Sequence, residues 1–175
     1  VSDGLVVFGC RDGWVYCVRL ADGELVWRLR AAPDERRIMV KGRLESAWPS
    51  YGTVIVQDGI IYLCSGRSSY MDGGLRFLEV DLYTGNILNT GVYFIEEEQR
   101  VPDALDYGTI NDILFIDGDK LYLPKQKFST SDFSATKRYG DPGIRPYNGL
   151  LDDSLFNRNQ WYRKSVEYMQ SVVGT

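Results

Sequence analysis

Histidine is absent from all 175 residues of this sequence, and this bears directly on the chemistry it can perform. Ser-His-Asp and Cys-His systems need an imidazole as general base, and HExxH zinc sites need one as a ligand. The chain by itself therefore forms none of these sites. Ser68 and Ser69 are accordingly poor candidates for nucleophiles.

Carboxylates are the remaining candidates for acid–base or metal chemistry. A glycosidase needs two acids that flank the scissile bond, and the visible runs are Glu96, Glu97 and Glu98, and Asp152 with Asp153. Adjacent residues on a strand point to opposite faces, so neither run supplies a convergent pair by itself. We interpret the glutamates as a solvated turn or edge. The two aspartates either hydrogen-bond within a loop or are weak candidates for contacting a hard cation or a sugar; we predict no catalytic residue and no metal site.

Two aromatic-containing segments are better candidates for binding a ligand. Arg67, Tyr70 and Asp72 lie in one of them, and Trp48 and Tyr51 lie in the other. Aromatic rings with Arg and Asp on loops of a rigid scaffold can stack on and hydrogen-bond a glycan or a peptide. The alternatives are that Trp48 and Tyr51 only cover an interface between sheets, and that Arg67 pairs with Asp72 only to hold its own loop.

These segments interrupt a pattern of strands that repeats along the chain. Residues 14–27 (WVYCVRLADGELVW) align with residues 76–89 (RFLEVDLYTGNILN) at an offset of 62, which places Gly23 on Gly85. Both segments have alternating apolar positions around a glycine turn, which predicts a β-hairpin. A second pattern recurs at 53–63 and 113–123, where Tyr62 and Tyr122 are 60 residues apart.

The repeat of about 60 residues predicts an all-β fold. Four short antiparallel strands per repeat form one blade of a β-propeller. We therefore predict a propeller fragment of about three four-stranded blades over residues 1–123, with insertions at 31–52 and 66–74 on one rim. A closed ring has about 4–8 blades. We expect the chain ends to be cut, and the open edges to be covered by the remaining blades of a parent protein or by other copies of the chain.

The C-terminal part follows the pattern less clearly. Residues 124–149 are rich in Ser, Thr, Gly, Pro and charged residues, which predicts a long loop. Beyond it, Trp161, Ser165 and Val172 have helical spacing. Residues 150–175 are equally compatible with a further blade strand or a short helix, and both alternatives stay open.

Composition and charge exclude several classes of partner. Hydrophobic residues make up 44% of the chain, which indicates a globular fold. The formal net charge of −4 does not favour nucleic acid, which needs a basic patch. No run approaches the roughly 18 apolar residues of a membrane-spanning helix. Cys10, Cys17 and Cys64 lack the spacing of a disulfide framework or a zinc site, so we expect three buried free thiols.

Two stretches resemble a known family. Residues 22–27 (DGELVW) and 82–88 (LYTGNIL) are similar to the repeats of quinoprotein-like (PQQ-type repeat) β-propellers, in which a tryptophan after the turn glycine docks one blade on the next. Trp27 stands at that position in the first repeat and Asn89 in the second. Residues 66–74 (GRSSYMDGG) and 150–161 (LLDDSLFNRNQW) also resemble a bacterial, exported subset of this family. The resemblance implies a periplasmic or extracellular location.

Quinone-dependent dehydrogenases of this family hold a calcium ion through Glu, Asn and Asp and often carry adjacent cysteines. No cysteines are adjacent here, and Glu79, Asp81, Asp152 and Asp153 fit no such motif, so we predict no cofactor. The function that we predict is a non-catalytic binding or assembly scaffold whose rim loops contact a protein or a carbohydrate. The alternative is part of an exported enzyme, either a quinoprotein-like oxidoreductase or a carbohydrate-active enzyme, with its site in the central funnel of the propeller.

Overall fold

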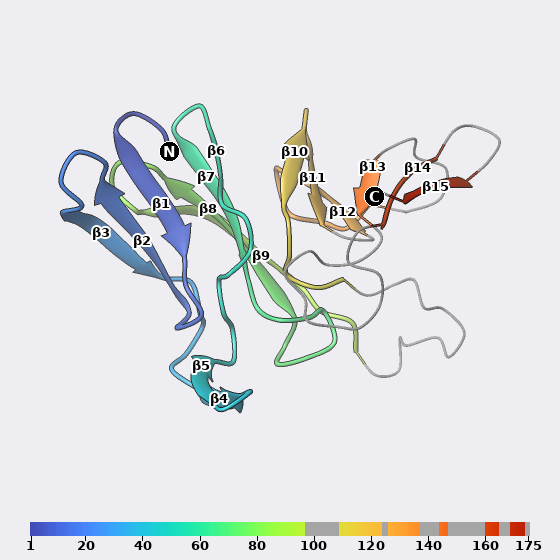
Figure 1. Cartoon of the computed structure of the whole chain (residues 1–175), viewed down its shortest axis with the longest axis horizontal. Coiled ribbons are helices and arrows are strands. Elements are labelled where there is room, and N and C mark those ends of the chain that lie inside the picture. The colour runs from blue at the N-terminus through green and yellow to red at the C-terminus, as the bar shows by residue number, and fades with distance from the viewer. Residues whose placement is uncertain (97–108, 124–125, 137–143, 147–159, 165–168, 174–175) are drawn as a thin grey trace.

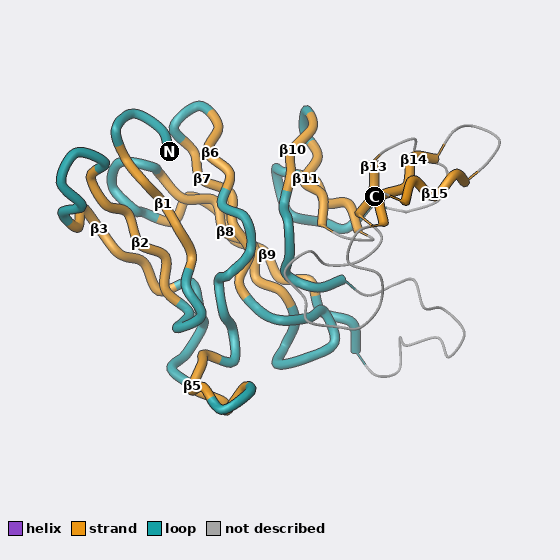
Figure 2. Tube along the Cα trace, in the orientation of Figure 1, coloured by secondary structure: helices purple, strands orange, loops and turns teal. Residues whose placement is uncertain are grey.

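The computed structural model describes residues 1–96, 109–123, 126–136, 144–146, 160–164 and 169–173, the last three ranges as backbone only. Within these ranges every element of regular secondary structure is a β-strand, and no residue is helical (Figure 2). The strands are β1 Leu5–Gly9, β2 Trp14–Arg19, β3 Leu25–Arg30, β4 Arg37–Val40, β5 Arg43–Ser46, β6 Ile55–Gln57, β7 Ile60–Ser65, β8 Leu75–Asp81, β9 Ile87–Tyr93, β10 Phe115–Asp117, β11 Lys120–Leu123, β12 Gln126–Ser129, β13 Ile144–Pro146, β14 Gln160–Lys164 and β15 Met169–Val173.

Three antiparallel sheets follow one another in chain order as blades of a β-propeller fragment (Figure 1). Blade 1 is β1-β2-β3, blade 2 is β6-β7-β8-β9 and blade 3 is β10-β11-β12. Blade 2 is the full four-stranded unit. The pairing registers show which strands correspond. In blade 1, β1, β2 and β3 are the counterparts of β7, β8 and β9. In blade 3, β10, β11 and β12 are the counterparts of β6, β7 and β8. The predicted all-β propeller fragment is confirmed.

The turn after the third strand of a full blade recurs in all three blades. In blade 2 the Asp81 amide donates to the Asn86 carbonyl, and the Gly85 amide donates to the Asp81 carbonyl, both at 2.9 Å. The equivalent bonds are Arg19 to Glu24 and Gly23 to Arg19 in blade 1, and Ser129 to Ser134 and Phe133 to Ser129 in blade 3. The residue that closes the turn has a left-handed φ each time: +76° at Gly23, +72° at Gly85 and +55° at Phe133.

This third turn corrects the prediction of a long loop over residues 124–149. β12 lies inside that range, pairs with β11 and buries Phe128 completely. A further strand, β13, spans Ile144–Pro146. The sequence hides the repeat because Phe133 occupies the turn position that glycine holds in the other two blades, where a non-glycine residue is uncommon.

Residues 150–175 contain the antiparallel strands β14 and β15, and β14 also pairs with β13. The described residues of this segment are therefore strand and not helix. Asp152 and Asp153, the weak metal candidates, lie outside the described residues.

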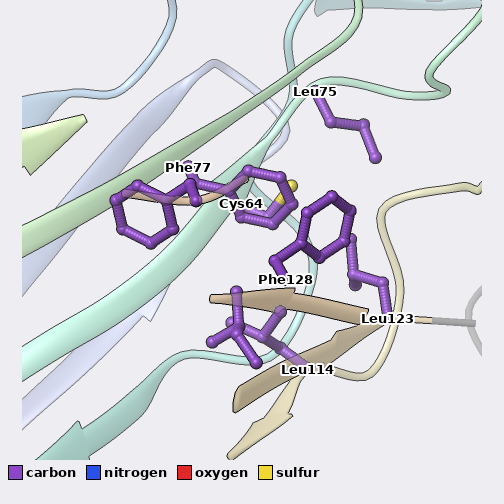
Figure 3. Close-up of a cluster of buried hydrophobic side chains, with 8 residues drawn as sticks. Cys64, Leu75, Phe77, Leu114, Leu123 and Phe128 are labelled. Atoms are coloured by element: carbon purple, nitrogen blue, oxygen red, sulfur yellow. The ribbon is translucent and has the colours of Figure 1, made fainter. Parts of the chain in front are cut away.

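Apolar side chains fill the two spaces between successive blades. The core between blades 1 and 2 contains Val15, Ala31, Ile61, Leu63, Leu78, Val80 and Leu82. The core between blades 2 and 3 contains Cys64, Leu75, Phe77, Leu114, Leu121, Leu123, Phe128 and Phe133 (Figure 3). These cores follow from the alternation of inward and outward residues along each strand.

Candidate functional site

The two insertions meet in a cluster of charged and aromatic side chains, which we call the rim cluster: Arg36, Trp48, Arg67 and Asp72. The Asp72 carboxylate accepts hydrogen bonds from Arg67, at 2.5 Å, and from Arg36 of the 31–52 insertion. The Trp48 indole N–H donates to the Asp72 carbonyl at 2.7 Å. The Arg36 guanidinium lies 4.7 Å from the centroid of the Trp48 ring, a cation–π contact. The rim cluster therefore joins the two loops.

The rim cluster exposes a guanidinium and encloses its carboxylate. Each carboxylate oxygen of Asp72 faces a guanidinium, and the side chain is only 16% exposed. Arg36 is 50% exposed, so its guanidinium is the group that solvent or a ligand can reach. A guanidinium on a fixed loop binds carboxylate, phosphate or hydroxyl oxygens. Trp48 is 8% exposed, and its ring packs within the protein.

The other two predicted ligand-binding residues have different neighbours. Tyr51 lies under the Arg11 guanidinium, 5.7 Å from its ring centroid, and Arg11 also pairs with the buried Glu45 at 2.9 Å. Tyr70 is half-buried, and its backbone N–H donates to the Ser68 hydroxyl. The structure thus joins Trp48, Arg67 and Asp72 directly.

The three cysteine thiols and Tyr16 all hold their protons more tightly than the free side chains do, because the pKa of each is raised. Burial raises the pKa of the Cys64 thiol, and burial is also the main cause that raises the pKa of Cys10 and of Cys17. Thiols of this kind stay protonated and unreactive near neutral pH. A hydrogen bond of 2.7 Å to Asp12 raises the pKa of Tyr16 to about 12.

A calcium ion, as held by the quinone-dependent dehydrogenases, needs several oxygen ligands grouped together. No group of three or more His, Cys, Asp or Glu side chains placed to hold a metal ion lies within the described ranges. No two cysteines are adjacent in the sequence.

The contact between blades 1 and 2 includes an indole dock. The Trp27 Nε1–H donates to the Leu82 carbonyl at 2.9 Å. A Cβ placed on Gly85 would come within 2.7 Å of the indole, so only glycine leaves room for the ring. The β2–β3 ladder has a β-bulge beside Trp27: Cys17 pairs with Trp27, whereas the next residue of β2, Val18, pairs with Leu25. Docking of Trp27 on the turn of the next blade, which the resemblance implies, is confirmed.

The contact between blades 2 and 3 reverses this arrangement. Asn89, at the position of Trp27, donates through its side-chain amide to the Ser131 carbonyl at 2.9 Å. The aromatic ring comes from the turn instead, because Phe133 packs on Gly91 and stacks on Phe77 with centroids 5.5 Å apart. Between blades 1 and 2, the strand supplies the ring (Trp27) and the turn supplies the glycine (Gly85). Between blades 2 and 3, the strand supplies the glycine (Gly91) and the turn supplies the ring (Phe133).

Blade 1 has an apolar face that no described element covers. The register equates five positions of blade 1 with five buried positions of blade 2. The equivalent pairs are Val6 and Ile61, Phe8 and Leu63, Tyr16 and Leu78, Val18 and Val80, and Leu20 and Leu82. Phe8 is 44% and Leu20 58% exposed, whereas the blade 2 residues are at most 2% exposed. This surface, which we call the open face, has the composition of a blade interface.

Two of these features, Arg36 and the open face, were not predicted from the sequence. Arg36 was missed because nothing in the sequence links it to Asp72, 36 residues away. The open face could have been found, since the repeat aligns Leu20 with Leu82 and makes both positions apolar.

No protein-family model and no curated protein matches this chain. Solved structures do match it. The chain is similar to a quinohemoprotein alcohol dehydrogenase, ADHIIG, from Pseudomonas putida HK5, with a TM-score of 0.53 and 13% identity. It is also similar to a europium-containing methanol dehydrogenase, with a TM-score of 0.56 and 12% identity. In both comparisons 98% of this chain is covered, but it spans only 25% and 39% of those proteins. These similarities show the fold, which is a fragment of a PQQ-like β-propeller.

No helix among the described residues is long and apolar enough to cross a membrane.

Proposed function

We propose that this chain is part of a non-catalytic propeller scaffold that assembles with further blades and presents its rim loops to a protein or carbohydrate. The open face carries the proposal. Phe8 and Leu20 expose apolar surface at positions that blade 2 buries against blade 1. Burial of apolar surface is the main favourable term in association. The partner that fits the open face is another blade, either from a longer parent protein or from a second copy of this chain.

The rim cluster supports the binding part of the proposal. Its ion pairs and the Trp48 hydrogen bond fix two loops in one conformation, which lowers the entropic cost of binding. Arg36 then presents a guanidinium to a ligand with acidic or hydroxyl groups. A periplasmic or extracellular location is part of the same proposal, and it rests on the resemblance of the repeats.

An exported enzyme with its site in the propeller funnel is the alternative. The two dehydrogenases share the fold at 12–13% identity, which does not extend to activity.

Light scattering coupled to size-exclusion chromatography tests the assembly. We expect the unaltered chain to form discrete oligomers or to aggregate through the open face. Leu20→Glu combined with Phe8→Glu should return it to a monomer. The matched control is Leu88→Glu with Val92→Glu, which changes exposed residues of β9, 54% and 63% exposed. An unaltered chain that stays monomeric and soluble at high concentration would contradict the proposal.

A further inference from the structure

We propose that the β4–β5 hairpin is a docking element for a membrane surface rich in anionic lipid. The proposal rests on the hairpin alone and is independent of the open face. β4 and β5 pair only with each other, and Figure 1 shows them apart from the three blades. The side chains at the end of the hairpin are therefore available to a flat surface.

The hairpin is built to hold an apolar pair outward. Lys41 and Gly42 form its two-residue turn with φ of +47° and +77°, the signs that a type I′ turn requires. This turn sets the register in which Met39 lies opposite Leu44. Met39 is 69% and Leu44 59% exposed, so two large apolar side chains project together from one face. The opposite face contains Ile38, which packs near Trp48, and fixes the hairpin to the body.

Cationic side chains lie along the hairpin on both of its faces: Arg37 shares the face of Met39 and Leu44, and Arg43, opposite Val40, lies on the other face near the turn. Residues 36–44 contain four basic residues and no acidic one, although the whole chain has a net charge of −4. Arg36 is already paired with Asp72. Arg37 and Arg43 are exposed, and within the described part of the chain neither makes an ion pair. The hairpin thus combines positive charge with exposed apolar groups.

Anionic lipid fits this combination better than an acidic protein does. A stable protein interface uses about 20–30 residues on each side, whereas the exposed hairpin comprises residues 37–44. A membrane needs only shallow insertion of apolar side chains beneath headgroups that attract the cations. An acidic peptide would use the cations and leave Met39 and Leu44 without a role.

Co-sedimentation of the full chain with vesicles tests the proposal. The probes are vesicles of phosphatidylcholine and vesicles of phosphatidylcholine mixed equally with phosphatidylglycerol. We expect binding to the mixed vesicles alone, weakened by added salt. Arg37→Gln with Arg43→Gln should weaken binding roughly 30-fold, from about fivefold per cation. Met39→Gln with Leu44→Gln should weaken it about tenfold, because less apolar surface enters the membrane.

Two matched control variants remove the same number of positive charges, or two apolar side chains, at positions away from the hairpin. Lys120→Gln with Lys127→Gln, on blade 3, should leave vesicle binding within about twofold, since neither cation lies on the hairpin. Leu88→Gln with Val92→Gln should leave it unchanged. Circular dichroism on heating confirms that each variant is folded. Leu20→Glu with Phe8→Glu should also bind normally, which separates this test from that of the assembly.

Three results would overturn the proposal. One is equal binding to neutral and anionic vesicles, and another is vesicle binding that survives both hairpin double variants. The third is binding to polyglutamate without binding to vesicles, which would assign the hairpin to an acidic protein partner.

Discussion

Replacing Gly85 with alanine tests the indole dock directly. The added Cβ would lie 2.7 Å from Cδ2 and 2.9 Å from Cε3 of Trp27, well inside the roughly 3.5–4 Å at which carbon atoms pack. The indole has to move. It would then lose its hydrogen bond to the Leu82 carbonyl, worth about 1 kcal/mol. It would also lose part of its packing, for which complete truncation of a buried aromatic sets an upper limit of about 3–5 kcal/mol.

Gly23 supplies a matched control within the same chain. Its φ of +76° is nearly that of Gly85, +72°, but a Cβ there meets no atom within 4 Å. Both alanine variants incur the left-handed penalty of about 1–2 kcal/mol. We expect Gly23→Ala to show only this penalty and Gly85→Ala to cost about 2 kcal/mol more, from the lost bond and packing.

Urea unfolding followed by far-ultraviolet circular dichroism gives the free energies of unfolding. In a Trp27→Ala background the clash is gone, so the two glycine substitutions should cost the same. If Gly85→Ala and Gly23→Ala are equally destabilising with Trp27 in place, the indole does not dock on this turn and the reasoning is wrong.

Three further outcomes are expected. Phe133→Ala should lower the free energy of unfolding by about 3–5 kcal/mol, because it empties a site between blades 2 and 3 that is only 3% exposed; a loss below 1 kcal/mol in urea unfolding would contradict this. Tyr16 holds its proton more tightly in the folded state, so its bond to Asp12 stabilises the fold below about pH 10 and this contribution is lost as the pH rises through about 12. Asp12→Ala should shift the absorbance titration of Tyr16 down, and an unchanged titration would refute the assignment. Asp72→Asn should cost about 1–2 kcal/mol and change the fluorescence of the chain, since two guanidinium groups lose a largely buried partner, while Asp22→Asn, whose ion pair is exposed, should cost under about 0.5 kcal/mol.

The fold was predictable wherever backbone conformation dictates residue type. Gly23 and Gly85 mark equivalent turns because a left-handed φ favours glycine, and the alternating apolar residues around them define the paired strands. The same rule concealed the third strand of blade 3, β12, and the turn after it, where Phe133 adopts the left-handed conformation and packs on Phe77. A local rule fails when tertiary packing outweighs it.

The candidate site was predictable only in part for a related reason. Arg67 and Asp72 share one loop, so their pairing follows from proximity in the sequence. The contribution of Arg36 depends on how the 31–52 insertion folds back, and the hydrogen bond of Trp48 to the Asp72 carbonyl depends on the same arrangement. Contacts between insertions have no period in the sequence, so the repeat analysis carries no information about them.

The exchange of ring and glycine between the two blade interfaces fixes the order of the blades. A blade that offers a tryptophan fits only a neighbour with a glycine turn, as Trp27 fits Gly85. Placed against blade 3, the same tryptophan would collide with Phe133, and a blade with Asn89 placed against Gly85 would leave a void. Neighbouring units of similar backbone are therefore not interchangeable. A chain with its blades shuffled should misassemble even though every blade could still form its own sheet.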